Sequence, residues 1–121
     1  MKERTLHIRI ESMDELFARA RASARRIDEG DRRPQGEHQS FTDIHTYLAS
    51  LTPKRLELLA SLNRSGASSI RALSKLIARD YKSVHQDVKI LMDLGMIVKR
   101  ADGLIEAPYD RIISDIRMAA A

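Results

Sequence analysis

Residues 68–107 read SSIRALSKLIARDYKSVHQDVKILMDLGMIVKRADGLIEA. Apolar residues recur here at helical spacing in two separate runs, and each run predicts the buried face of a helix. Only a few residues separate the runs, and a connection that short makes the two helices cross. The second helix is therefore expected to pack its apolar stripe inward and to present its other face to solvent. The first stripe is Ile70, Leu73, Leu76 and Ile77, and the second is Val84, Val88, Leu91 and Met92.

The ends of these helices carry capping residues. Ser68 and Asp80 stand where a side-chain oxygen accepts the free N–H groups of a helix start, so they are the predicted caps of the first and second helix. Gly95 is expected to end the second helix, because glycine readily adopts a left-handed backbone.

A hairpin is predicted next. Residues 96–98 begin an extended run, Asp102 and Gly103 form the turn, and Leu104 and Ile105 return as the second strand. Lys99 and Arg100 precede the turn, where they are placed to contact phosphate.

A further helix precedes the two crossing helices. Thr52 and Pro53 mark its start, with proline at the first helical position. Leu56, Leu59 and Leu62 make its inner face, and Gly66 follows its end. The order of three helices and a hairpin is that of a winged helix-turn-helix. We therefore predict an α+β fold with a DNA-binding domain of this type over residues 52–107.

The N-terminal segment, residues 1–51, is predicted as a strand-helix extension for dimerisation or partner binding. Leu6, Ile8 and Ile10 alternate with polar residues, as in a half-buried strand. Ser12 and Glu15 form a capping box for a helix that ends near Gly30. Residues 28–40 are predicted to be a loop or hinge, with a brief strand from about residue 39 and then a helix to residue 51. The inner face of the first helix is predicted to be Met13, Leu16, Phe17, Ala20, Ala24 and Ile27.

The C-terminal segment, residues 108–121, is predicted as a strand. Pro108 breaks the hairpin, and Ile112, Ser114, Ile116 and Met118 then alternate. A single pair of strands from opposite ends of a small protein is marginal alone, so we expect the first strand, the tail strand or both to pair across a homodimer. The predicted dimerisation residues are Leu6, Ile8, Ile10, Ile112 and Ile116.

Composition argues against an enzyme. The chain has 121 residues and no cysteine, so disulfides and thiolate metal sites are absent. Its four histidines are scattered, and the spacing of His38, Asp43 and His45 does not build a metal face. Neither a phosphate loop nor a nucleophile motif occurs, and no cofactor is expected. With neither a membrane span nor a signal peptide, the expected compartment is the cytoplasm.

Positive charge gathers on the predicted DNA-binding domain. Residues 52–89 hold eight Lys or Arg against three Asp or Glu, whereas the chain as a whole carries a net charge of only +4. A local basic excess is expected of a surface that meets phosphates.

The second crossing helix carries the predicted readers of DNA bases. Gln86 can pair with adenine, and Lys82 or His85 with guanine or phosphate. Three side chains also have a structural interpretation in which they do not contact DNA. Tyr81 would be part of the core, His85 an ordinary surface residue, and Asp87 the partner of a nearby cation. Lys54 and Arg55 are expected to add charge. The predicted DNA-binding residues are Ser68, Ser69, Arg71, Lys75, Tyr81, Lys82, Ser83, His85, Gln86, Lys89, Lys99 and Arg100.

The strings LTPKRLELLASL (residues 51–62), RDYKSVHQDV (79–88) and LGMI (94–97) resemble those of a group of small prokaryotic winged helix-turn-helix proteins regarded as transcriptional regulators. The resemblance covers residues 51–118 and implies dimeric DNA binding. Some members are encoded beside a candidate toxin, which makes an antitoxin role a second implication. Ala78 departs from the pattern, because such motifs usually carry glycine near this turn.

We therefore expect a homodimeric, sequence-specific regulator of double-stranded DNA that acts as a repressor or autoregulator. The main alternative is a protein-binding module, such as an antitoxin, that uses the winged helix as a scaffold and holds a toxin through the N-terminal helix or the loop. RNA binding is less favoured, because the chain has only three Tyr and two Phe for base stacking.

Overall fold

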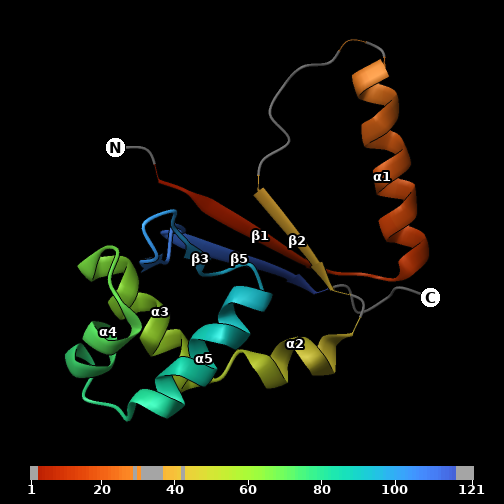
Figure 1. The fold of residues 1–121 in the computed structure, drawn as a ribbon. Helices are drawn as coiled ribbons and strands as arrows, with labels where there is room; N and C mark the ends of the chain where they lie inside the picture. The colour runs from red at the N-terminus through yellow and green to blue at the C-terminus, as the bar shows by residue number, and fades with distance from the viewer. Residues whose placement is uncertain (1–2, 29, 31–36, 42, 117–121) are drawn as a thin grey trace.

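A computed structural model of the chain describes residues 3–28, 30, 37–41 and 43–116. The fold is α+β, as expected, and the described part contains five helices, a three-stranded sheet and a two-stranded sheet (Figure 1). None of the described helices is long and apolar enough to cross a membrane. The elements are β1 (Thr5–Ile10), α1 (Met13–Asp28), β2 (Glu37–Phe41), α2 (Ile44–Ser50), α3 (Pro53–Ser65), α4 (Ile70–Leu76), α5 (Tyr81–Asp93), β3 (Val98–Lys99), β4 (Ile105–Glu106) and β5 (Arg111–Ile116).

The larger sheet joins the two ends of the chain. Its order is β2-β1-β5, and β1 pairs in parallel with both neighbours. The predicted strands are confirmed, and Leu6, Ile8 and Ile10 point inward with exposures of 3%, 0% and 6%. Met118 lies outside the described residues.

Pairing across a dimer was expected because the two strands would be marginal alone within one chain, and this reason was wrong. β1 and β5 pair with each other inside one chain, Leu6 opposite Ile112 and Ile10 opposite Ile116. β2 adds a third strand, which begins at Glu37 in what the sequence indicated as a loop. Leu6, Ile8 and Ile10 belong to the core of the single chain, whereas Ile112 is half-buried and Ile116 is 38% exposed.

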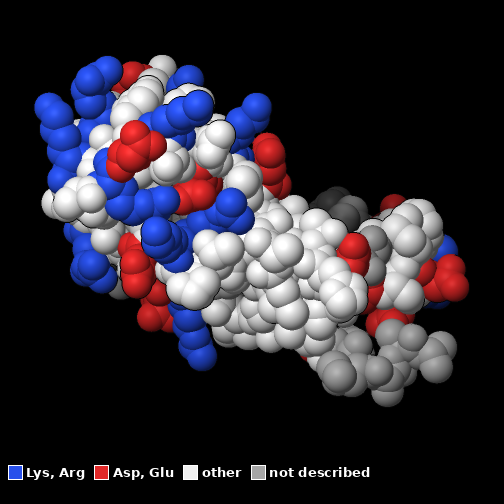
Figure 2. All heavy atoms as spheres, turned by 90° about the horizontal axis from the view of Figure 1, so that it is seen from below, with Lys and Arg blue, Asp and Glu red and all other residues white. Residues whose placement is uncertain are grey.

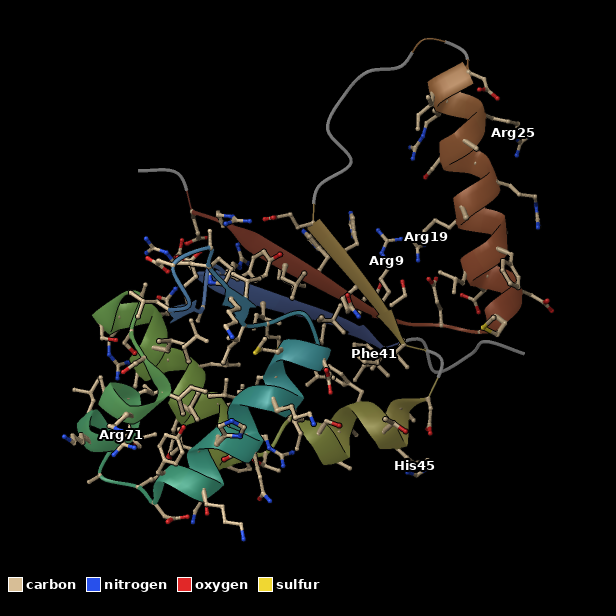
Figure 3. All side chains as sticks on the ribbon, in the orientation of Figure 1. Arg9, Arg19, Arg25, Phe41, His45 and Arg71 are labelled. Carbon is tan, nitrogen blue, oxygen red and sulfur yellow. The ribbon has the colours of Figure 1, made fainter. Side chains whose placement is uncertain are left out.

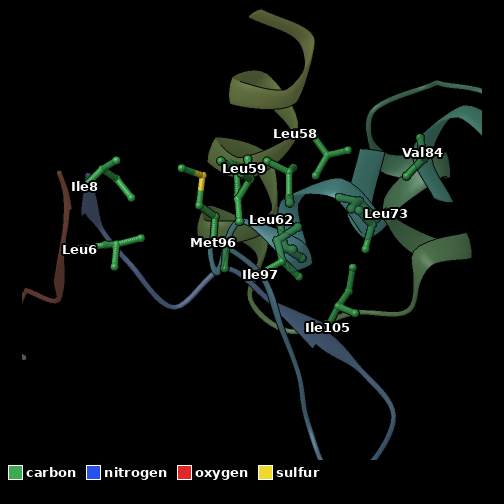
Figure 4. Close-up of a cluster of buried hydrophobic side chains, with 14 of the residues drawn as sticks. Leu6, Ile8, Leu58, Leu59, Leu62, Leu73, Val84, Met96, Ile97 and Ile105 are labelled. Atoms are coloured by element: carbon green, nitrogen blue, oxygen red, sulfur yellow. The ribbon is translucent and has the colours of Figure 1, made fainter. Parts of the chain in front are cut away.

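One hydrophobic core joins the sheet to α2–α5, which cover its inner face (Figures 1 and 4). Leu6 and Ile8 reach it from β1, and Leu58 and Leu62 from α3. Tyr47 of α2 is 2% exposed, and its hydroxyl lies 2.6 Å from the Ser114 hydroxyl of β5. The first and last segments of the chain thus share one core with the central helices.

Helix α3 begins and ends where predicted, but it is rotated from its predicted orientation. The Thr52 hydroxyl accepts from the Arg55 N–H, and Gly66 follows the last turn with φ of +84°. Leu59 and Leu62 are buried, but Leu56 is 46% exposed and Leu58 replaces it in the core. The inner face is therefore set by Leu58, Leu59 and Leu62, because the sheet packs beside them as well as α5.

Of the caps predicted for α4 and α5, the Asp80 cap is confirmed and the other cap lies at Ser69 instead of Ser68. Asp80 accepts the N–H of Ser83 at 2.9 Å and caps α5 as predicted. Ser69, and not Ser68, caps α4 by accepting the Ala72 N–H at 3.0 Å. The backbone of Ser68 instead pairs with Ile105 through two hydrogen bonds, which hold the helix start against the hairpin.

The turn between α4 and α5 contains a strained residue. Ala78 has φ of +53° and is the one non-glycine with a positive φ in the described part of the chain. Side chains pay a steric cost in this left-handed region, which is why glycine is common there. The turn therefore has the geometry that a glycine would satisfy, although the sequence has alanine.

The hairpin follows its predicted turn but has shorter strands. Gly95 ends α5 with φ of +78°, and Gly103 closes the turn with φ of +87°. β3 and β4 have two residues each, and the N–H groups of Met96 and Ile97 bond to the Leu91 carbonyl of α5 instead of joining the hairpin.

Helix α1 forms as predicted, but its expected inner face does not pack. Ser12 caps it through the Glu15 N–H, at 3.2 Å. None of its residues is buried, and α1 stands across the sheet from α2–α5 (Figure 1). Met13, Phe17 and Ile27 are 49%, 51% and 47% exposed.

Candidate nucleic-acid interface

Helix α5 separates its apolar and polar sides cleanly. Val84, Val88 and Leu91 are buried, as predicted. Lys82, Gln86 and Lys89 are exposed, and at about 100° per residue they lie on the opposite side of the helix. Asp93 lies on this outward side near the end of the helix, so the cationic stripe is confined to its earlier turns. The helix thus presents cations and an amide on one ridge.

A groove runs beside α5. It lies between the start of α4, one flank of α5 and the hairpin, with a volume of about 350 Å³. Six predicted DNA-binding residues line it: Ser69, Arg71, Tyr81, His85, Lys89 and Lys99. Three consecutive elements of the chain therefore combine in one exposed, cationic hollow. The other six are not among its lining residues: Ser68, Lys75, Lys82, Ser83, Gln86 and Arg100.

An aromatic stack forms part of the groove wall. The Arg71 guanidinium lies 5.3 Å from the centre of the Tyr81 ring, and the His85 ring lies 5.9 Å from the same centre. Tyr81 is 45% exposed, so the alternative in which it caps the core is wrong. This cation–π contact holds the Arg71 guanidinium of α4 against the Tyr81 ring at the start of α5. The stack fixes the direction of a cation that is otherwise on a long, flexible side chain.

Four predicted contact residues have other partners. Ser68 is half-buried, and its hydroxyl donates to the Ser69 carbonyl. Ser69 and Ser83 take part in the caps of α4 and α5, and the Ser83 hydroxyl donates to Asp80 at 2.9 Å. Arg100 forms an ion pair with Asp102 at 3.1 Å. These contacts engage the three serine hydroxyls within the protein and pair the charge of Arg100 with Asp102.

Asp87 holds the helices together. Its carboxylate accepts from Arg55 of α3 at 3.0 Å and from Arg79 of the preceding turn at 2.7 Å. Arg55 also donates to the Ser50 carbonyl at the end of α2. The expectation that Asp87 pairs with a cation is confirmed, whereas the expectation that Arg55 adds surface charge is wrong because the residue is 18% exposed and paired.

The hydrogen bonds from Arg55 and Arg79 determine the charge state of Asp87. Burial raises the pKa of its carboxyl, but the hydrogen bonds from Arg79 and Arg55 outweigh burial, and the pKa lies below its ordinary value. The carboxylate therefore stays ionised and fixes α5 against α3 and the turn.

The charged surface is uneven (Figure 2). In the view from below, Lys and Arg gather over the end of the molecule made by α3–α5, while the middle is largely uncharged. Among the described residues, no group of three His, Asp or Glu is placed to hold a metal ion. The exposed cations of this end include Lys54, Arg71, Lys75, Lys82, Lys89 and Lys99.

A protein-family model named HVO_A0114 matches residues 50–114, which is more than half of the chain. The chain belongs to the HVO_A0114 family. No curated protein and no solved structure matches it. The HVO_A0114 match covers α3, α4, α5 and the hairpin, and it extends into β5. It therefore contains the whole groove, while β1, α1 and β2 lie outside it.

Proposed function

We propose that this protein is a homodimeric, sequence-specific regulator that binds double-stranded DNA through a winged helix-turn-helix. The observation that carries the proposal is the outward ridge of α5, with Lys82, Gln86 and Lys89, beside the cationic groove. Helices α4 and α5 pack together across a turn of four residues, as in a helix-turn-helix. The major groove of DNA admits one α-helix, which reads base edges with its exposed side chains.

The two parts of this surface have different chemical roles in the proposal. Lys82 and Gln86 lie on the ridge and face base edges, where a glutamine amide can pair with adenine. Arg71, Lys89 and Lys99 converge from three elements around the groove and hold the phosphates beside it. The β3–β4 hairpin acts as the wing, with Lys99 as its phosphate contact.

The regulatory part of the proposal is repression or autoregulation. Two copies related by a two-fold axis read a palindromic site with half-sites a whole number of helical turns apart. A protein of this kind blocks access to the DNA that it covers.

The interface is tested by titrating mixed-sequence duplex DNA into isotopically labelled protein and following backbone amide signals. The proposal predicts salt-sensitive shifts at Arg71, Gln86, Lys89 and Lys99. It predicts little change at Asn63 and Arg64, which line a separate pocket beside β5. Shifts confined to α1, or no shifts at low salt, would overturn the DNA assignment.

One observation favours a second candidate, a protein-binding module of the antitoxin type. The apolar side of α1 is exposed and lies outside the part matched by the HVO_A0114 family. In that case a toxin covers α1 and the winged helix serves as scaffold or as a separate DNA contact. The amide titration discriminates between the two, because DNA and a protein partner contact opposite ends of the molecule.

A further inference from the structure

Helix α1 turns its polar side to the protein. Arg19 forms an ion pair with Glu11 and donates to the Ser40 hydroxyl at 2.8 Å. Figure 3 shows Arg19 directed from α1 toward the sheet, whereas Arg25 points away. Polar contacts thus hold the helix from one side and leave the other side to solvent. The half-buried residues of α1 are Glu15, Leu16, Arg19, Ala22 and Ser23.

The exposed side carries a regular apolar seam. Met13, Phe17, Ala20, Ala24 and Ile27, here called the α1 seam, follow one another at intervals of four, three, four and three residues. This is the spacing of a coiled-coil interface. All five residues are exposed, with Phe17 at 51%. A helix in water gains most of its stability from packing its apolar face, so a seam of this length indicates a helical partner.

The charges of α1 indicate which kind of helix can pack against the α1 seam. Asp14 and Glu15 lie in the first turn, and Arg25 and Arg26 lie in the last turn. Asp14 and Arg25 are exposed, and a second copy of α1 running antiparallel places Asp14 of each helix near Arg25 of the other. Opposed helix dipoles favour the same arrangement.

The shape of the seam agrees with that orientation. When two copies run antiparallel about Ala20, Met13 of one faces Ile27 of the other, and Phe17 lies beside Ala24. Phe17 then packs against a small side chain, whereas Met13 and Ile27 pack large against large at the two ends of the seam. The two Ala20 residues meet at the two-fold axis, where small side chains allow close approach of the backbones.

We infer that the α1 seam is a homodimer interface in which α1 of one protomer packs antiparallel against α1 of its partner. The inference deepens the dimeric part of the proposed function by naming the surface, and it does not require DNA. Its contact is confined to a helix of 16 residues, so the dimer forms and dissociates reversibly.

The position of α1 has a consequence for DNA sites if the proposed function holds. α1 stands across the sheet from α5, so a dimer joined through α1 separates the two α5 ridges by both protein bodies (Figure 1). Half-sites are then separated by more than one helical turn.

Sedimentation equilibrium of the full chain over a wide concentration range tests the dimer. Phe17→Asp puts a charge in the seam, and we expect it to shift the chain to monomer. Ala18→Asp is the matched control, because Ala18 is exposed on the same helix outside the seam. Circular dichroism checks that both variants keep the helix content of the parent. A chain that is monomeric throughout, or a dimer equally stable in both variants, would overturn the inference.

Engineered cysteines test the orientation in a chain that has no cysteine of its own. Disulfides need Cα atoms about 4.4 to 6.8 Å apart. Under mild oxidation, Ala20→Cys is expected to give a covalent dimer, whereas Ala24→Cys and Ala18→Cys stay monomeric on denaturing gels. Cross-linking at both 20 and 24 would contradict the antiparallel arrangement, and cross-linking at neither would contradict the seam.

These experiments distinguish failure of the α1 dimer interface from failure of the proposed DNA binding. Monomeric protein that binds DNA overturns the seam and leaves DNA binding in place. A seam dimer that shows no DNA binding supports the interface and overturns the proposed function instead.

Discussion

Gln86 and Lys89 lie one turn apart on the exposed side of α5, yet they carry different chemistry. A glutamine amide offers a donor and an acceptor in fixed geometry, which suits one base. A lysine ammonium is a point charge on a flexible stem, which suits any phosphate. In the proposed function, Gln86 would therefore supply specific contacts to DNA and Lys89 non-specific ones.

Gln86→Ala is expected to cost about 1 to 3 kcal/mol of binding free energy on the preferred site and to relax selectivity at one base pair. Loss of the amide removes a paired hydrogen bond and leaves the other contacts in place. Competition binding against a set of singly substituted sites measures the effect. Uniform weakening on every site would show that Gln86 does not read a base.

Lys89→Ala is expected to weaken binding to all sequences alike and to reduce the slope of log affinity against log salt by about 1. One fewer cation releases one fewer counterion from the DNA. Fluorescence anisotropy over a salt series measures the slope. Arg64→Ala is the control, since it removes the same charge from a residue that lines a separate pocket beside β5. An equal change in both variants would place the interface elsewhere.

Asp87 links residue chemistry to stability. Because its pKa is lowered in the folded protein, its contribution is present above the unfolded value near 3.8 and is lost as the pH falls through the folded pKa. Asp87→Asn is expected to reduce the free energy of unfolding at pH 7 by about 2 to 3 kcal/mol, because two guanidinium groups lose a charged partner.

Urea unfolding of both proteins between neutral and acid pH checks this prediction. The gap in the free energy of unfolding between the parent and Asp87→Asn is expected to narrow at acid pH, where the parent carboxyl is protonated. A gap that stays constant with pH would show that the loss comes from packing and not from the charge of Asp87.

The elements show which features are local. Caps and turns could be predicted because each depends on a few neighbouring residues, as with Thr52, Asp80 and Gly95. The Ser68 cap was wrong because a distant residue, Ile105, pairs with its backbone. The start of β2 was missed because Glu37 and His38 have no alternating apolar pattern, and the strand is made by pairing with β1.

The turn between α4 and α5 allows a stability test. Ala78→Gly is expected to raise the free energy of unfolding by about 1 kcal/mol, because glycine relieves the strain of a positive φ. Thermal unfolding measures the gain. Ala72→Gly is the opposite control, since Ala72 lies exposed inside α4, where glycine costs about 1 kcal/mol. A loss of stability in both variants would contradict the strained turn.

At the scale of the whole molecule, β1 and β5 join the ends of the chain through one core. Their pairing could not be predicted, because alternation identifies a strand but not its neighbour. Six of the twelve residues predicted from the sequence line the groove, but the sequence did not show that Arg55 pairs with Asp87. The exposed α1 seam was misjudged for a related reason: periodicity shows that a face is apolar, not what covers it.

We propose that this HVO_A0114 protein reads a DNA sequence as a dimer. Selection of bound duplexes from a random-sequence pool across a salt series, followed by sequencing, tests this proposal. A palindromic motif that survives moderate salt is expected, with half-sites separated by more than one helical turn. Recovery of no motif, with weak binding that disappears as salt rises, would contradict it.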